Sequence, residues 1–160
     1  MGASALSLVW AASQRDEQGR SSGEGPRHPG DGYPSPPAIL VIEDEVLIRL
    51  AICDYLRDFG YRVIEGSTSE EAQRVFRAGE PIEVLFSDVE LGSRMDGFAL
   101  AKWVRQHYPH VRILLTSGVA KISEEDAGLS DGPFFSKPYS HETLEANIRR
   151  LAGLFGRRTG

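Results

Sequence analysis

Charged and hydroxyl side chains follow four hydrophobic runs of this 160-residue sequence, at places where they could act together. Glu43 and Asp44 follow the first run, Asp88 the second and Lys137 the last, and Thr116 lies at the end of the third. Clustered carboxylates repel each other, and a hard divalent cation relieves that repulsion. Oxygen ligands without His or Cys favour Mg²⁺. An ammonium and a hydroxyl group beside the ion suit phosphoryl transfer, and a carboxylate can accept the group as an aspartyl phosphate.

Alternating strand and helix signals from Ala38 onward predict how these side chains are positioned. The run AILVI has no polar alternation, which is typical of a strand covered on both faces. Strands that alternate with helices predict a three-layer α/β fold with parallel strands and right-handed crossovers. Ligands bind such sheets at the carboxyl ends of the strands, where the charged side chains occur. We expect strands at 38–42, 61–65, 82–87, 111–117 and 133–136, and helices at 45–59, 68–78, 97–108, 119–130 and 140–154.

Five short motifs, in this order and at these strand ends, resemble the receiver domain of two-component response regulators. The resemblance covers residues 38–154 and implies a doubly wound (βα)5 sheet with the flavodoxin-like strand order 2-1-3-4-5. It also implies a signalling domain that is not an enzyme. The motifs are IEDE at 42–45, SDVEL at 87–91, MDG at 95–97, LLTSG at 114–118 and FFSKPY at 134–139.

The resemblance assigns a role to each strand-end residue. It implies that Asp88 is the phosphoacceptor and that Glu43 and Asp44 hold Mg²⁺ together with Asp88. The backbone carbonyl of Glu90 would be the remaining protein ligand.

The same resemblance assigns the groups around the phosphoryl oxygens. Thr116 and Lys137 would each contact one of these oxygens, with a cis peptide bond between Lys137 and Pro138. Phe134 occupies the position of the aromatic ring that turns inward when such domains are phosphorylated. Changes of this kind alter the face made by the fourth helix, the fifth strand and the fifth helix.

Three residues depart from the family pattern. Gly92 replaces the proline that usually stands four residues after the acceptor, so we expect a looser loop. The Glu90 side chain could approach the phosphoryl group or the metal. Gly118 is expected to leave the mouth of the pocket open.

Composition separates the chain into parts. Residues 1–37 contain six Gly and five Pro, a density that disfavours helices and sheets, so we expect a disordered leader, then a domain at 38–154 and a tail at 155–160. The net charge of −5 disfavours direct binding to nucleic acid. A single Cys excludes internal disulfides. No apolar run is long enough to span a membrane, and the first basic residue follows the apolar stretch at 3–12, so we expect a cytoplasmic protein.

The expected function is that of a stand-alone receiver. The resemblance implies a histidine kinase or a histidine phosphotransfer protein as donor, and a downstream protein as target. It leaves open a homodimer formed on phosphorylation. Two alternatives remain, which are a receiver-shaped interaction module without phosphate control and a Toprim-like metal-dependent enzyme. A Rossmann or P-loop nucleotide site is excluded because the first strand is followed by EDE and not by glycines.

Overall fold

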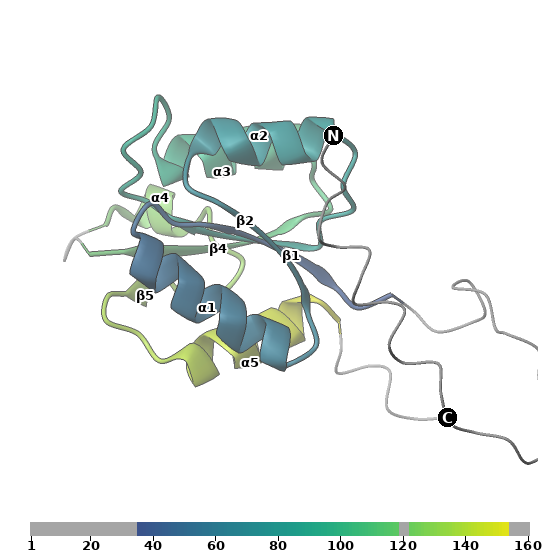
Figure 1. Cartoon of the computed structure of the whole chain (residues 1–160). Coiled ribbons are helices and arrows are strands. Elements are labelled where there is room, and N and C mark those ends of the chain that lie inside the picture. Colours follow the sequence, from purple (N-terminus) through teal and green to yellow (C-terminus); the bar gives the residue numbers. More distant parts are fainter. Residues whose placement is uncertain (1–34, 119–121, 154–160) are drawn as a thin grey trace, which may run out of the picture. The chain divides into compact units, whose positions relative to one another are not determined.

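The computed structural model describes residues 35–118 and 122–153, in which strands and helices alternate along the chain (Figure 1). The predicted leader lies almost entirely outside these residues, and so does the tail at 155–160. The strands are β1 (Ala38–Ile42), β2 (Arg62–Gly66), β3 (Val84–Asp88), β4 (Arg112–Ser117) and β5 (Phe135–Ser136). The helices are α1 (Val46–Asp58), α2 (Ser69–Arg77), α3 (Gly97–His107), α4 (Glu124–Ala127) and α5 (His141–Leu151).

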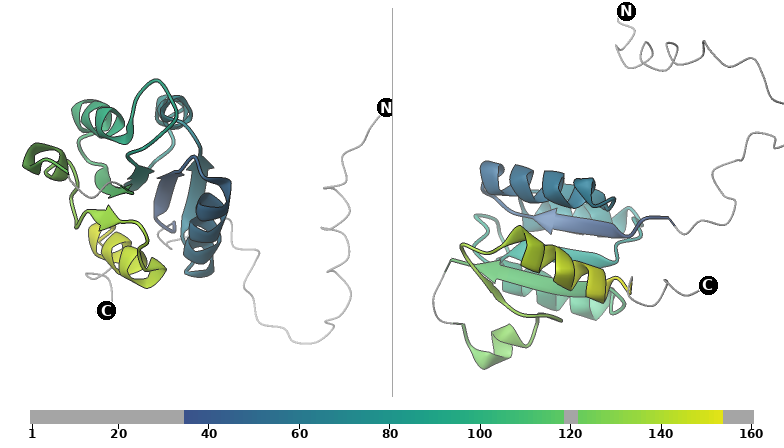
Figure 2. Two further views of the ribbon diagram at one scale, coloured as in Figure 1. Left: turned by 90° about the vertical axis from the view of Figure 1, so that its left-hand side faces the viewer. Right: turned by 90° about the horizontal axis from the view of Figure 1, so that it is seen from below.

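All strand pairs are parallel, in the order β2-β1-β3-β4-β5. Helices α2 and α3 cover one face of the sheet and α1 and α5 cover the other, as the two views in Figure 2 also show. The predicted three-layer fold and its strand order are therefore confirmed. Among the described helices, none is long and apolar enough to cross a membrane.

The core consists of two hydrophobic clusters, one on each face of the sheet. In β1, Leu40 and Ile42 join the cluster under α2 and α3, whereas Ile39 and Val41 join the cluster under α1 and α5. Cys53 of α1 is fully buried in the second cluster, as expected for a small core residue. Every residue of β1 is buried, so this continuous apolar run forms a strand that is covered on both faces, as predicted.

The helix starts follow from capping side chains. Thr68 accepts a hydrogen bond from the Glu71 N–H at the start of α2. Asp96 and Ser140 cap α3 and α5 in the same way.

Two elements are shorter than predicted. The fourth helix, expected over 119–130, covers only Glu124–Ala127, beginning at the Ser123 cap, and residues 119–121 lie outside the described part. The fifth strand, expected over 133–136, is limited to Phe135 and Ser136, which pair with Thr116 and Ser117 of β4.

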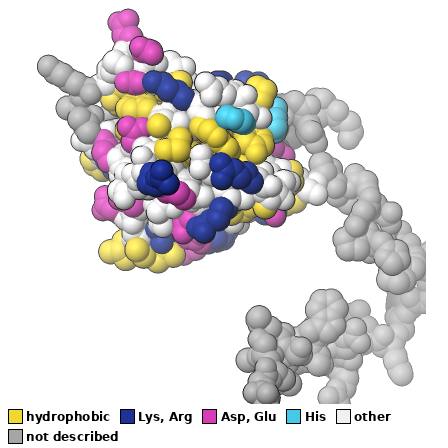
Figure 3. All heavy atoms as spheres, turned by 90° about the horizontal axis from the view of Figure 1, so that it is seen from above, with side chains coloured by type: hydrophobic (Ala, Val, Ile, Leu, Met, Phe, Trp, Pro, Cys, Tyr) yellow, Lys and Arg dark blue, Asp and Glu magenta, His cyan; other side chains and the backbone are white. Residues whose placement is uncertain are grey.

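The outer side of α2 and α3 carries a partly exposed aromatic group. Figure 3 views the molecule from this side and shows hydrophobic side chains among cationic ones and histidines. The Phe76 and Tyr108 rings stack with centroids 4.7 Å apart, and the Arg77 guanidinium lies 5.6 Å from the centre of the Trp103 ring. These contacts hold α2 against α3 above the sheet.

Asp131, between α4 and β5, connects three parts of the chain. Its Oδ2 accepts a hydrogen bond from the Ile113 backbone N–H of β4 at 2.7 Å. Both carboxylate oxygens lie 3.2 Å from the Arg105 guanidinium of α3. The segment before β5 is therefore fixed to the sheet and to α3.

Candidate phosphoacceptor site

The carboxyl ends of the central strands bring the predicted side chains to one edge of the sheet. Asp88 is the last residue of β3 and pairs with Thr116 of β4. Glu43 follows β1, which lies beside β3, and Lys137 follows β5, which lies beside β4. Parallel pairing therefore places residues that are 45 and 49 positions apart around one point.

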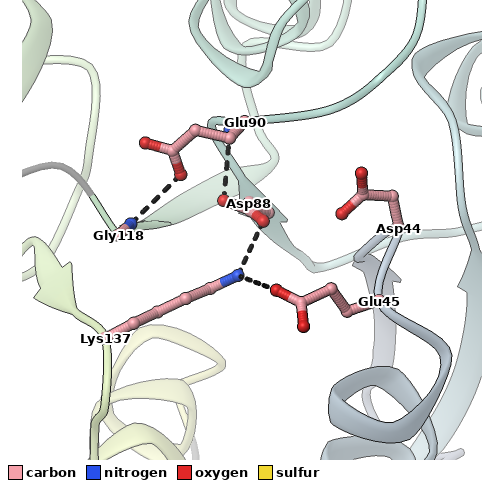
Figure 4. Close-up of a pocket in the computed structure, with 6 residues that line it drawn as sticks. All are labelled: Asp44, Glu45, Asp88, Glu90, Gly118 and Lys137. Carbon is pink, nitrogen blue, oxygen red and sulfur yellow. Dashed lines mark hydrogen bonds and ion pairs between the residues drawn. The ribbon is translucent and has the colours of Figure 1, made fainter.

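A cavity of about 310 Å³ opens at this edge (Figure 4). Two predicted site residues, Glu43 and Thr116, lie behind its surface, and Glu45 and Gly118 form part of it. The lining residues are Asp44, Glu45, Asp88, Glu90, Gly118 and Lys137.

Lys137 is the cationic centre of the site. Its Nζ donates a hydrogen bond to Asp88 Oδ2 at 2.7 Å. The same Nζ forms ion pairs with Glu43 Oε2 at 3.1 Å and with Glu45 Oε1 at 3.7 Å. The Lys137–Pro138 peptide bond is cis, as the sequence predicted. One ammonium therefore contacts three carboxylates.

The acidic group fits a divalent cation. Oxygen atoms of Glu43, Asp44 and Asp88 all lie within 4.8 Å of one another. Glu43 is fully buried, and its Oε2 contacts Lys137 without the geometry of a hydrogen bond. A buried carboxylate oxygen without a hydrogen bond, next to two further carboxylates, matches the oxygen ligands that Mg²⁺ prefers.

Burial changes the acidity of these groups. Loss of hydration raises the pKa of Glu43 to about 7, and the negative charge of Asp88 adds to the effect. Loss of hydration also raises the pKa of Asp88, although the hydrogen bond from Lys137 opposes the shift. Partial burial alone would lower the pKa of Lys137, but the hydrogen bond to Asp88 and the negative charges of Asp88 and Glu43 outweigh this effect and raise it. Both carboxylates thus gain from a nearby cation.

The Thr116 hydroxyl does not enter the cavity. It is buried and donates a hydrogen bond to the Phe135 backbone oxygen at 2.9 Å. The predicted contact with a phosphoryl oxygen therefore requires this hydroxyl to leave β5. Phe134, the predicted switch aromatic, is partly buried, and its ring centroid lies 6.2 Å from that of Phe98 in α3.

The Glu90 side chain crosses the edge of the cavity toward β4. Its carboxylate accepts hydrogen bonds from Ser117 Oγ and from the Gly118 backbone N–H, the latter at 3.1 Å. Removal from water alone would raise the pKa of Glu90, but hydrogen bonds to its carboxylate, above all from Ser117, outweigh this effect and lower it. The mouth that Gly118 was expected to leave open is therefore bridged by this carboxylate.

Sequence reasoning did not predict this bridge or the participation of Glu45. The strand order could have predicted the bridge. Because β3 and β4 are neighbours, the residues that follow these two strands lie close together.

The loop between β3 and α3 is tied to α2. The Ser69 N–H donates to Ser93 Oγ at 3.3 Å, and the Arg94 N–H donates to Glu70 Oε1 at 3.2 Å. These contacts restrain the loop that was expected to be looser because it carries Gly92.

At the end of this loop, Gly97 packs directly on the backbone of Asp88. A Cβ at this position would clash with the backbone oxygen of Asp88 and would lie 2.7 Å from Val89 Cα. The Gly97 N–H also donates to the Val89 oxygen at 2.9 Å. The glycine of the MDG motif is thus required for the start of α3 to approach β3 this closely.

Known proteins share both the sequence pattern and the fold. The family described as response regulator receiver domain matches residues 39–149. A probable transcriptional regulator ycf27 of Pyropia yezoensis is 34% identical over 115 residues, which cover 71% of this chain and 46% of that protein. The chain thus spans about half the length of that relative.

Solved receiver structures superpose on the chain. A CheY-like receiver domain protein from Methanospirillum hungatei has a TM-score of 0.68 at 21% identity, covering 78% of this chain and all of that one. The response regulator TrrA from Thermotoga maritima, in complex with Mg²⁺-BeF, has a TM-score of 0.65 at 23% identity, covering 72% and 98%. The motif order, the strand order and the family match over 39–149 show that the chain belongs to the response regulator receiver domain family.

Proposed function

We propose that the domain accepts a phosphoryl group on Asp88 and signals through protein contacts. The observation that carries the proposal is the position of Asp88, whose carboxylate lies 2.7 Å from the Lys137 ammonium and within 4.8 Å of the Glu43 and Asp44 oxygens. Family membership supports this role. The donor is a phosphohistidine of a histidine kinase or of a histidine phosphotransfer protein, or a small acyl phosphate.

The chain's own groups would bind and orient the reactants. An Asp88 carboxylate oxygen attacks phosphorus, the bond from phosphorus to the donor nitrogen or oxygen breaks, and the donor leaves with that electron pair. Lys137 neutralises charge on the transferred group and on the acceptor. The Glu90 N–H, 3.1 Å from Asp88 Oδ1, helps to orient the carboxylate.

Mg²⁺ would be held by Glu43, Asp44, Asp88 and the backbone carbonyl of Glu90. When bound, it would neutralise the negative charge that gathers during transfer.

The signal that the site sends depends on the residues at the ends of β4 and β5. Thr116 hydrogen-bonds to the backbone of β5, and Lys137 follows β5 directly. A phosphoryl group that draws either residue inward would therefore change the face formed by α4, β5 and α5. We propose that this face binds a downstream protein, with homodimer formation as one form of output and with no direct contact to nucleic acid.

Phosphoryl incorporation tests the proposal. The full chain is incubated with acetyl phosphate and Mg²⁺, and intact-protein mass spectrometry is expected to show one added phosphoryl group. Asp88→Asn should abolish it. Asp96→Asn is the matched control, because Asp96 caps α3 and Asn caps helices equally well. Incorporation that persists in Asp88→Asn would refute the acceptor role. Absence of incorporation in every variant would favour an interaction module without phosphate control.

A further inference from the structure

A carboxylate of the chain itself occupies hydrogen-bond donors at the mouth of the acceptor cavity. Glu90 receives hydrogen bonds from Ser117 Oγ and from the Gly118 N–H, at the end of β4. Its own backbone N–H donates to Asp88 Oδ1 at 3.1 Å. One residue therefore connects the acceptor to the end of the neighbouring strand, as Figure 4 shows for Asp88, Glu90 and Gly118.

One donor that Glu90 occupies, the Gly118 N–H, also suits an incoming anion. Gly118 lines the same cavity as Asp88 and Lys137, so its N–H lies at the surface that a phosphoryl group on Asp88 would face. Phosphoryl oxygens are strong acceptors and bind backbone N–H groups and hydroxyls readily. A phosphoryl oxygen and the Glu90 carboxylate would thus compete for the Gly118 N–H.

Charge adds to this competition. A phosphoryl group carries roughly −1.5 to −2 charges at neutral pH. The cavity of about 310 Å³ is already lined by four acidic side chains and a single lysine. Among these acids, Glu90 is the one whose carboxylate is hydrogen-bonded to the end of β4. Repulsion between the phosphoryl group and this carboxylate therefore acts directly on β4.

We propose that Glu90 is a built-in anionic competitor. Its carboxylate holds Ser117 and Gly118 while Asp88 is unmodified, and an anion at Asp88 displaces it and frees the end of β4. The inference rests on the proposed phosphoacceptor function and deepens it. It makes Glu90 a positioning residue that opposes the modified state and so sets how readily the site fills.

Affinity for a phosphoryl mimic tests the competitor. Full-length chains are titrated with beryllofluoride in the presence of Mg²⁺, and binding is followed by calorimetry. Glu90→Gln keeps the size of the side chain and removes its charge, so its Kd should fall about tenfold, the value of one charge-assisted hydrogen bond. Ser117→Ala keeps the Glu90 charge and removes a hydroxyl that holds Glu90 but does not line the cavity, so its Kd should fall about threefold.

Glu45→Gln is the matched control for charge alone. Glu45 lines the same cavity and pairs with Lys137 at 3.7 Å, whereas the bonds from Ser117 Oγ and the Gly118 N–H go to Glu90. Its Kd should change less than that of Glu90→Gln.

A second measurement follows the Gly118 amide by NMR, first without and then with beryllofluoride. The Gly118 amide proton resonance of ¹⁵N-labelled protein should move upfield in Glu90→Gln, because the bond to a charged acceptor is lost. The change that beryllofluoride causes at this amide should be smaller in the variant than in the wild type.

Each outcome is decisive. Tighter binding by Glu90→Gln than by Glu45→Gln, together with the Gly118 shift, supports the competitor. Binding by the wild type without a gain in Glu90→Gln, or with an equal gain in Glu45→Gln, overturns the competitor and leaves the acceptor role of Asp88 intact. No binding by the wild type or by any variant overturns both proposals. If Glu90→Gln does not fold, unchanged affinity in Ser117→Ala overturns the competitor.

Discussion

Replacing the buried Glu43 by glutamine tests how stability is balanced against metal binding at this site. Glu43 is fully buried, and a pKa of about 7 in place of 4.5 corresponds to about 3 kcal/mol of differential interaction between its two protonation states. Glutamine keeps the shape and carries no charge to bury. It also gives up the ion pair with Lys137 at 3.1 Å. We therefore expect the free energy of unfolding at pH 8 without metal to rise by about 1–2 kcal/mol.

The sign of the pH dependence follows from proton binding. Between pH 4.5 and about 7 the folded protein holds a proton on Glu43 that the unfolded chain has largely lost. The unfolding free energy of the wild type therefore falls as the pH rises through this window, whereas Glu43→Gln lacks this contribution. The difference between the two proteins should be small at pH 5 and largest at pH 8.

Urea denaturation in EDTA at pH 5 and pH 8 measures this difference. Glu45→Gln is the control, because the Glu45 side chain is 64% exposed and is not desolvated to the same degree. A Glu43→Gln variant that is less stable at pH 8, or changed equally at both pH values, would refute the reasoning. Adding Mg²⁺ at a hundredfold its Kd should stabilise the wild type by about 2.7 kcal/mol and the variant by less.

Two further predictions concern metal binding and the frame around the site. The Mg²⁺ affinity should rise with pH by up to about tenfold per unit below pH 7 as Glu43 loses its proton, and a flat calorimetric profile from pH 5.5 to 7.5 would contradict this. Asp131→Ala should lower the free energy of unfolding by about 1–3 kcal/mol, because the Ile113 N–H and Arg105 lose their acceptor. The exposed Asp54→Ala, which breaks an ion pair at 3.4 Å with Arg57, should cost less than about 0.5 kcal/mol, and equal losses in urea denaturation would count against the assignment to Asp131.

The sequence predicts the fold and the location of the site because both depend on patterns of residue type along the chain. Continuous apolar runs mark the buried strands, and parallel pairing then brings their carboxyl ends to one edge. Asp88 and Lys137 could be placed together in this way. The cap at Thr68 was equally accessible, because a threonine ahead of a helical pattern acts through local hydrogen bonds.

The orientation of individual side chains could not be predicted, because it depends on which partner each group finds in the folded chain. The Thr116 hydroxyl donates to the Phe135 oxygen on β5, and the Glu90 carboxylate binds Ser117 and Gly118. Both sets of hydrogen bonds join residues of different strands or strand ends, so they depend on the folded chain. The fourth helix was overestimated at both ends, although Ser123 and Gly128 flank it as local caps.

The contact of Gly97 with the acceptor divides the site into a fixed half and an adjustable half. The first residue of α3 touches the peptide of Asp88 with no side chain between them, so β3 and the start of α3 behave as one rigid block. On the opposite side, β5 reaches Asp88 through the Lys137 side chain that follows it, and the torsions of this side chain change at little cost. Strain introduced at Asp88 is therefore transmitted toward β5, which moves relative to the rigid block.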